Sequence, residues 1–210
     1  MFKDRQDAGK KLAAKLTSYK GNPKAIVLGL PRGGVVVSHE IAEALGLPMD
    51  ILVPRKISVP DNPEFAIGAV TENGEAVFDE RALGLYGITQ EYIDEEVEKE
   101  KKESARRLKT YRGSRTPLDL HGKIAVIVDD GVATGATMRA AILSAKAGGA
   151  EKITVAVPVI ARDSLALIQK EVDEVVYIAA PLLFGAVGTF YDEFPQTDDE
   201  EVIALMRSAV

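Results

Sequence analysis

The run IAVIVDDGVATGATM, Ile124 to Met138, constrains the fold more than any other part of this chain. Its first five residues are apolar, which predicts a buried strand, because strands of a parallel sheet carry apolar side chains on both faces. Asp129 and Asp130 follow directly, and small or hydroxyl-bearing residues then lead into a helix expected over 137–147. Open α/β sheets bind ligands at the carboxyl ends of their strands. The segment therefore predicts a strand, a binding loop and a helix of an α/β protein.

The loop after this strand has the properties of an anion site. Small residues from Gly131 to Thr137 let backbone N–H groups approach an anion closely, and the positive end of the next helix adds to the same site. Asp129 and Asp130 can accept hydrogen bonds from vicinal ribose hydroxyls. The alternative is a plain strand, turn and helix with an aspartate cap, although a cap needs only one short polar residue. We therefore predict a site for a phosphorylated sugar.

The segment VIVDDGVATGAT resembles the phosphoribosyl pyrophosphate loop of type I phosphoribosyltransferases. The resemblance implies transfer of phosphoribose from phosphoribosyl pyrophosphate to a nitrogen acceptor such as a nucleobase, with release of pyrophosphate. Magnesium is then expected as the cofactor, held by substrate oxygens near the two aspartates rather than by direct protein ligands. The implied ribose ligands are Asp129 and Asp130, and the implied 5′-phosphate ligands are Ala133, Thr134, Gly135, Ala136 and Thr137.

Composition excludes several other classes of protein. A chain of 210 residues with 46% hydrophobic content is expected to form one domain around one core. A formal net charge of −6 provides no basic field for nucleic acid. Apolar runs such as 153–161 are far shorter than the roughly 20 residues that span a bilayer. We expect a soluble, cytoplasmic protein without a nucleic-acid or membrane partner, and a homodimer stays open.

Strand and helix patterns alternate along the chain, which indicates a mainly parallel sheet flanked by helices. Strands are expected at 25–28, 49–53, 66–70, 76–78, 124–128, 153–157 and 175–179. Helices are expected at 7–19, 35–45, 137–147 and 163–170, and a last one, capped by Thr197 or Asp198, runs through Met206. The fold class is α/β, type I phosphoribosyltransferase-like: a single domain over 1–210 with a core at about 20–180, a helical insertion at about 79–116 and a small hood from about 181 to 210.

The segment from Thr89 to Arg112 is dense in charge, with acids early and bases late. This order suits a helix macrodipole, so we expect a long, mostly solvated helix that lies across the body or meets a partner subunit. Two interpretations of its basic end stay open. The bases are solvated, as in most charge runs, or they face the phosphates; the candidates are Arg106, Arg107, Arg112 and Arg115.

A second anion site is predicted where the strand at 25–28 ends in GLPRGG, residues 29–34. Gly33 and Gly34 permit close approach of backbone N–H groups, and the planar fork of Arg32 matches phosphate oxygens. The alternative is a glycine turn with an exposed arginine. The family resemblance assigns this loop to the leaving pyrophosphate.

Arg55 and Lys56 follow the strand expected at 49–53 and are predicted to add positive charge beside the pyrophosphate. The stretch SVPDNPEFAIG after them contains two prolines and few apolar residues, which predicts a loop that closes over substrate. Glu64 is its candidate acid, although an exposed glutamate is more often solvated. The predicted catalytic residues are Arg32, Lys56, Asp129 and Asp130.

The stretch 181–202 concentrates the aromatic residues Phe184, Phe190, Tyr191 and Phe194. The resemblance implies a hood over the acceptor base, and aromatic faces stack on bases of any sequence, so Phe190 and Tyr191 are the base-contact candidates. The equally weighted alternative is that these rings fill a secondary core.

Ala133 bears on the identity of the acceptor. In 6-oxopurine members of the family an acid stands three residues after the second loop acid and serves as general base, and here that position holds Ala133. Adenine is therefore the first acceptor to test, and hypoxanthine and guanine are expected to be poor. Two rival functions stay open: a regulatory protein that binds phosphoribosyl pyrophosphate or a nucleotide without turnover, and a phosphate-sugar hydrolase, which lacks an evident activated nucleophile. His39 and His121 have no metal-ligand partner at suitable spacing.

Overall fold

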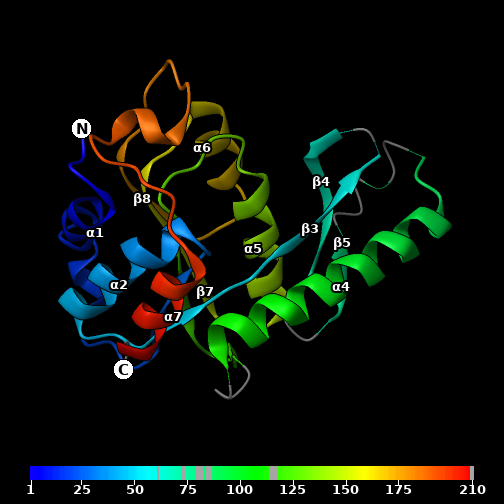
Figure 1. Ribbon diagram of the computed structural model, residues 1–210, viewed down its shortest axis with the longest axis horizontal. Helices are drawn as coiled ribbons and strands as arrows, with labels where there is room; N and C mark the ends of the chain where they lie inside the picture. Colours follow the sequence, from blue (N-terminus) through cyan, green and yellow to red (C-terminus); the bar gives the residue numbers. More distant parts are fainter. Residues whose placement is uncertain (61, 72–73, 79–82, 84–86, 114–117, 209–210) are drawn as a thin grey trace.

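The computed structural model describes residues 1–60, 62–71, 74–78, 83, 87–113 and 118–208, with only the backbone of 63–66. A five-stranded parallel sheet forms its centre (Figure 1). In spatial order the strands are β2 (Met49–Ile51), β1 (Ala25–Gly29), β6 (Ile124–Val128), β7 (Lys152–Val159) and β8 (Glu174–Ala179). β1 pairs with β6 from Ala25 opposite Ile124 to Gly29 opposite Val128. The predicted α/β fold with a mainly parallel sheet is confirmed.

Helices cover both faces of this sheet, which explains why the central strands β1 and β6 are apolar throughout. They are α1 (Arg5–Ala13), α2 (Gly33–Leu45), α5 (Ala136–Ala147), α6 (Arg162–Ile168) and α7 (Asp199–Ser208), with short 3-10 helices η1 (Thr17–Tyr19) and η2 (Val187–Phe190). In β1, Val27 packs in one buried cluster with residues of α1, α2 and α7. The next residue, Leu28, packs in another with residues of α5 and α6. Neither described face of the sheet is left to solvent.

The helix boundaries follow local chemistry. The Asp4 side chain accepts a hydrogen bond from the backbone of Asp7 and begins α1, and Asp198 does the same for the Glu201 N–H at the start of α7. The helix expected over 7–19 is shorter, since α1 ends at Ala13 and η1 follows. Leu16 and Tyr19 are nevertheless buried, so the spacing of the apolar residues over 7–19 resembles that of one continuous helix.

A second, three-stranded antiparallel sheet lies to one side of the central sheet (Figure 1). Its strands are β3 (Arg55–Val59), β4 (Asn62–Val70) and β5 (Ala76–Phe78). The loop predicted from residue 58 is therefore wrong, because Ser58 and Val59 end β3 and the chain returns at once in β4. Ile57, Val59 and Ile67 are buried, which stabilises this hairpin despite the neighbouring prolines.

The predicted long charged helix is confirmed as α4 (Gln90–Arg112), which begins where the Thr89 side chain accepts a hydrogen bond from Tyr92 N–H. Ile93 and Val97 pack on the small sheet, so the helix covers that sheet rather than standing free in solvent. No helix within the described ranges has the length and apolar character needed to cross a membrane.

Candidate functional site

The two predicted anion loops lie side by side because β1 and β6 are neighbours with the same direction. Glycines make this contact close. A Cβ on Gly33 would overlap Asp130 Oδ2, and one on Gly34 would lie 2.8 Å from the Val128 carbonyl oxygen. Real Cβ atoms do not come so near to another heavy atom, so a larger residue at Gly33 would displace the Asp130 side chain, and one at Gly34 would shift the neighbouring loop. The structure thus brings Gly33, Gly34, Asp129 and Asp130 together.

Each of the two aspartates has one carboxylate oxygen bound within the protein. Asp129 Oδ1 accepts the Asp130 backbone N–H at 2.9 Å, and Asp130 Oδ2 accepts Arg5 Nε–H at 2.7 Å. In the described part of the chain no donor reaches Asp129 Oδ2 or Asp130 Oδ1. Two acceptor oxygens are therefore left for a ligand at the end of β6.

Burial perturbs both carboxyl groups. It raises the pKa of Asp129 well above its usual value, and repulsion from the Asp130 charge adds to this rise. Burial also raises the pKa of Asp130, while the hydrogen bond and charge of Arg5 act in the opposite direction. Perturbed acids at a loop edge are typical of functional sites.

Arg5 is a member of this site that the sequence did not reveal. The residue is only 9% exposed. Its Nη1 donates to the Pro195 carbonyl at 2.6 Å, and its guanidinium lies 3.7 Å from the centre of the Phe194 ring. The Tyr191 hydroxyl also donates to the Asp130 backbone carbonyl, at 2.5 Å. The N-terminal helix and the C-terminal segment therefore hold Asp130 from two sides.

The predicted phosphate cradle, residues 133–137, forms the turn into α5. Gly135 has φ of 80°, a left-handed conformation that favours glycine, and α5 begins at the next residue. Ser164 donates to the Ala133 carbonyl at 2.5 Å and fixes the turn from α6. Thr134 and Thr137 are exposed beside the N-terminus of α5, where an anion is favoured.

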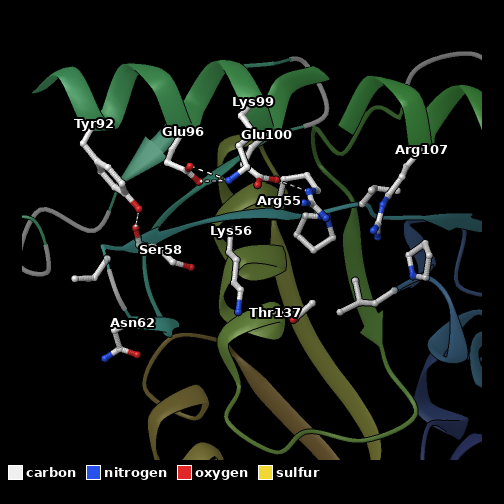
Figure 2. Close-up of a pocket in the computed structure, with 15 residues that line it drawn as sticks. Arg55, Lys56, Ser58, Asn62, Tyr92, Glu96, Lys99, Glu100, Arg107 and Thr137 are labelled. Carbon is white, nitrogen blue, oxygen red and sulfur yellow. Dashed lines mark hydrogen bonds and ion pairs between the residues drawn. The ribbon is translucent and has the colours of Figure 1, made fainter. Parts of the chain in front are cut away.

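A cavity of about 500 Å³ lies between the central sheet and the unit formed by the small sheet and α4. The 29–34 loop contributes Leu30 and Pro31, and α5 contributes Thr137. The Lys56 side chain points across the cavity toward Thr137 (Figure 2). The other polar lining residues are Arg55, Ser58, Asn62, Tyr92, Glu96, Lys99, Glu100 and Arg107.

Two ion pairs lie in the wall of this cavity. Arg55 Nε donates to Glu100 at 2.5 Å, and Lys99 donates to Glu96 at 2.8 Å (Figure 2). Arg32 is placed differently from its prediction: its Nη1 lies 3.7 Å from Asp199 at the start of α7, and it is absent from the described lining. The structure therefore brings Arg55, Lys56 and Thr137 to one cavity but leaves Arg32 outside it.

Residues 2–187 match the family described as the phosphoribosyl transferase domain. The chain belongs to this family.

Two relatives of this chain come from two strains of Mycobacterium tuberculosis. The name of each calls it, provisionally, a phosphoribosyl transferase. Each is 44% identical over 209 residues, which is 100% of this chain and 47% of the relative. The chain thus spans about half the length of these curated relatives. The crystal structure of TT1426 from Thermus thermophilus is 41% identical, with a TM-score of 0.90 over 98% of this chain and 97% of that one.

The other arginine and glutamate candidates from the sequence lie in different parts of this phosphoribosyl transferase domain. Arg106 is exposed and binds Glu103. Arg112 is buried and donates to Asp50 and to the Ile51 carbonyl, so it joins α4 to β2. Arg115 and the side chain of Glu64 lie outside what the structure describes.

The aromatic residues of the predicted hood pack on one another. The ring centres of Tyr191 and Phe194 are 4.8 Å apart, and those of Phe184 and Phe190 are 5.2 Å apart. They form a small cluster with Phe2 from the N-terminus. This packing agrees with a secondary core, and a role of Phe190 or Tyr191 in contacting a base stays a prediction.

The histidines lie away from both loops. His39 faces Ser208, and His121 faces Asp119. Over the residues that the structure describes, no three histidine, aspartate or glutamate side chains come together as metal ligands.

Proposed function

We propose that this chain transfers phosphoribose from phosphoribosyl pyrophosphate to a nitrogen acceptor such as a nucleobase and releases pyrophosphate. This reaction would make it a pentosyl-transferring enzyme of nucleotide metabolism. One observation carries the proposal: Asp129 Oδ2 and Asp130 Oδ1 are left without a described donor between two loops suited to anions. The two vicinal hydroxyls of ribose can donate to these two oxygens. The 5′-phosphate and the pyrophosphate of the substrate would then each lie beside one of the two loops.

The residue roles follow from position. Asp129 and Asp130 would accept the ribose hydroxyls, and the turn from Ala133 to Thr137 would hold the 5′-phosphate at the N-terminus of α5. Backbone N–H groups at Gly33 and Gly34, with Arg55 and Lys56 across the cavity, would hold the pyrophosphate. Arg32 would join them only after leaving Asp199. The weak, half-exposed contact between the two would permit this change.

The chemistry asked of these residues is electrostatic. Breaking the bond between ribose and pyrophosphate develops positive charge on the sugar, as in glycoside hydrolysis, and the two carboxylates beside it stabilise that charge. Lys56 and the loop N–H groups stabilise the negative charge that builds on the leaving group. Asp129 and Asp130 are the residues near which magnesium would be held, and it would supply positive charge to the phosphates, because it prefers carboxylate, phosphate and water oxygens.

A second, smaller cavity supports a place for the acceptor. It has a volume of about 320 Å³ and lies between Ala133 and Thr134 of the phosphate turn and Leu182 and Phe184 of the C-terminal segment. Its lining combines one aromatic ring, Phe184, on which a flat base would stack, with the charged side chains of Arg162 and Asp163, which would face the polar edge of the base. Adenine is the first candidate, because Ala133 cannot take a proton from a 6-oxopurine.

Turnover and simple binding can be separated by one experiment. We expect phosphoribosyl pyrophosphate with magnesium to raise the melting temperature, since a ligand that binds only the folded chain adds about 2.7 kcal/mol at a hundred times its Kd. Pyrophosphate release is then measured with a panel of purine and pyrimidine bases, and adenine is expected to give the fastest release. Brisk release with hypoxanthine would contradict the inference from Ala133.

The rival function is a regulatory protein that binds the same ligand. The observation in its favour is the alanine at position 133, where 6-oxopurine members have an acid that serves as general base. Tight binding of phosphoribosyl pyrophosphate with no pyrophosphate release for any base would favour the regulatory protein over the enzyme.

The aspartate pair is tested by Asp129→Asn. The amide oxygen of asparagine can still accept the Asp130 N–H, so the loop keeps its shape, but the charged acceptor for ribose is lost. We expect affinity for ribose 5-phosphate to fall about 10- to 100-fold, as for a charged hydrogen bond of about 1.5–3 kcal/mol. Affinity for inorganic phosphate, measured in the same calorimeter, should not change, and an equal loss for both ligands would mean that Asp129 does not recognise ribose.

A further inference from the structure

We propose that Arg107 of α4 binds the pyrophosphate group of phosphoribosyl pyrophosphate. The proposal rests on the proposed function and adds a residue to its site from outside the central sheet. It also assigns α4 a part in substrate binding.

The position of Arg107 is the first support. Its side chain extends from α4 into the cavity of about 500 Å³ (Figure 2), which Leu30 and Pro31 of the predicted pyrophosphate loop line from the other side. Ile93, Glu100 and Arg107 are spaced seven residues apart, so they lie on one face of the helix. Ile93 packs on the small sheet and Glu100 binds Arg55, which directs Arg107 to the same side.

The charge of the cavity is the second support. Its lining contains four basic residues and two acidic ones, and Glu96 and Glu100 are each paired with one base, Lys99 and Arg55. Lys56 and Arg107 are the two bases whose charge no lining carboxylate balances. In a chain of net charge −6, such a cavity attracts a compact polyanion.

The donors of Arg107 are the third support. Its Nε donates to Glu103 at 2.8 Å, whereas no hydrogen bond joins its Nη1 or Nη2 to any residue that the structure describes. Glu103 also accepts two hydrogen bonds from Arg106. The hydrogen bonds from Arg106 and Arg107 together lower the pKa of Glu103 to about 2. One carboxylate thus orients two guanidinium groups and balances only one of them. The outer end of Arg107 can make the two-pronged contact that guanidinium forms with phosphate.

Arg106 provides a matched control. The two arginines are adjacent in sequence and share Glu103, but only Arg107 lines the cavity. We would titrate magnesium pyrophosphate into the unaltered protein, Arg107→Gln and Arg106→Gln by calorimetry. Arg107→Gln is expected to weaken binding about tenfold or more, the size of a charged hydrogen bond. Arg106→Gln is expected to stay within about twofold, because surface ion pairs contribute little.

Further readouts separate the outcomes. Melting temperatures and affinity for ribose 5-phosphate should match in the two variants, and Arg107→Lys should restore only part of the pyrophosphate affinity because it keeps the charge without the planar fork. Equal pyrophosphate affinity in both glutamine variants would overturn the role of Arg107 and leave the proposed function standing. Failure of the unaltered protein to bind either pyrophosphate or phosphoribosyl pyrophosphate would overturn the proposed function itself.

Discussion

Gly34→Ala is expected to abolish binding of ribose 5-phosphate and to lower the melting temperature by several degrees. An added Cβ would lie 2.8 Å from the Val128 carbonyl oxygen and 2.9 Å from Asp129 Cα. Both atoms belong to the backbone of the neighbouring strand and its loop, so no side-chain rotation relieves the clash. The two loops must separate, and overpacking of this kind costs about 1–3 kcal/mol. Thermal unfolding and calorimetry with ribose 5-phosphate measure the two effects.

Gly185→Ala is the matched control for Gly34→Ala. No described atom lies within 4 Å of a Cβ built on Gly185, so the same chemical change meets open space there. Melting temperature and ribose 5-phosphate affinity should stay close to those of the unaltered protein. Normal ligand affinity in Gly34→Ala would show that the contact between the loops does not matter for the site.

Arg5→Met is expected to have the other large effect. It leaves Asp130 without its cation in a largely buried place, where removing one partner of an ion pair costs about 3–5 kcal/mol. Arg5 acts to lower the pKa of Asp130 against the effect of burial, so in the variant Asp130 takes up a proton at a higher pH. If ionised Asp130 accepts a ribose hydroxyl, ribose 5-phosphate binding is then lost at a higher pH as the solution is acidified.

The pH dependence of ribose 5-phosphate affinity tests this prediction in the unaltered protein and in Arg5→Met. Phe194→Leu serves as the control, because it removes the ring beneath the guanidinium and keeps the charge. It should lower stability without moving the pH midpoint. An unchanged pH midpoint of ribose 5-phosphate affinity in Arg5→Met would mean that Arg5 has only a structural role.

The sequence was sufficient for those parts of the fold in which neighbouring residues determine the structure. The apolar runs at 25–28 and 124–128 predicted two buried strands, and the glycines at 33 and 34 and the small residues after Asp130 predicted the adjoining loops. The charge order in residues 89–112 likewise predicted α4. Each of these signals is local, with strong propensities behind it.

Sequence reasoning missed contacts between distant residues. The prolines and polar residues of the β3 hairpin predict a loop, although the hairpin also carries buried apolar residues. The partners of these residues, Ile93 and Val97, come more than twenty residues later. Arg5 pairs with Asp130 across 125 positions, and no local pattern marks it. Sequence reasoning did not separate Arg107 from three other arginines, and the packing of α4 on the small sheet does so. The seven-residue spacing from Ile93 through Glu100 is the signal that would have singled it out.

The pairing of β1 with β6 also has a consequence for how the chain folds. Gly29 lies opposite Val128, 99 positions away, and the small sheet and α4 occupy the sequence between them. Closing a loop of this length delays such pairing relative to local structure. The hairpin and α4 can form while that loop is still open, but the two anion loops then remain apart. A partly folded chain in which α4 is helical but β1 and β6 are unpaired therefore lacks the joined loops, and the candidate site forms only when these two strands pair.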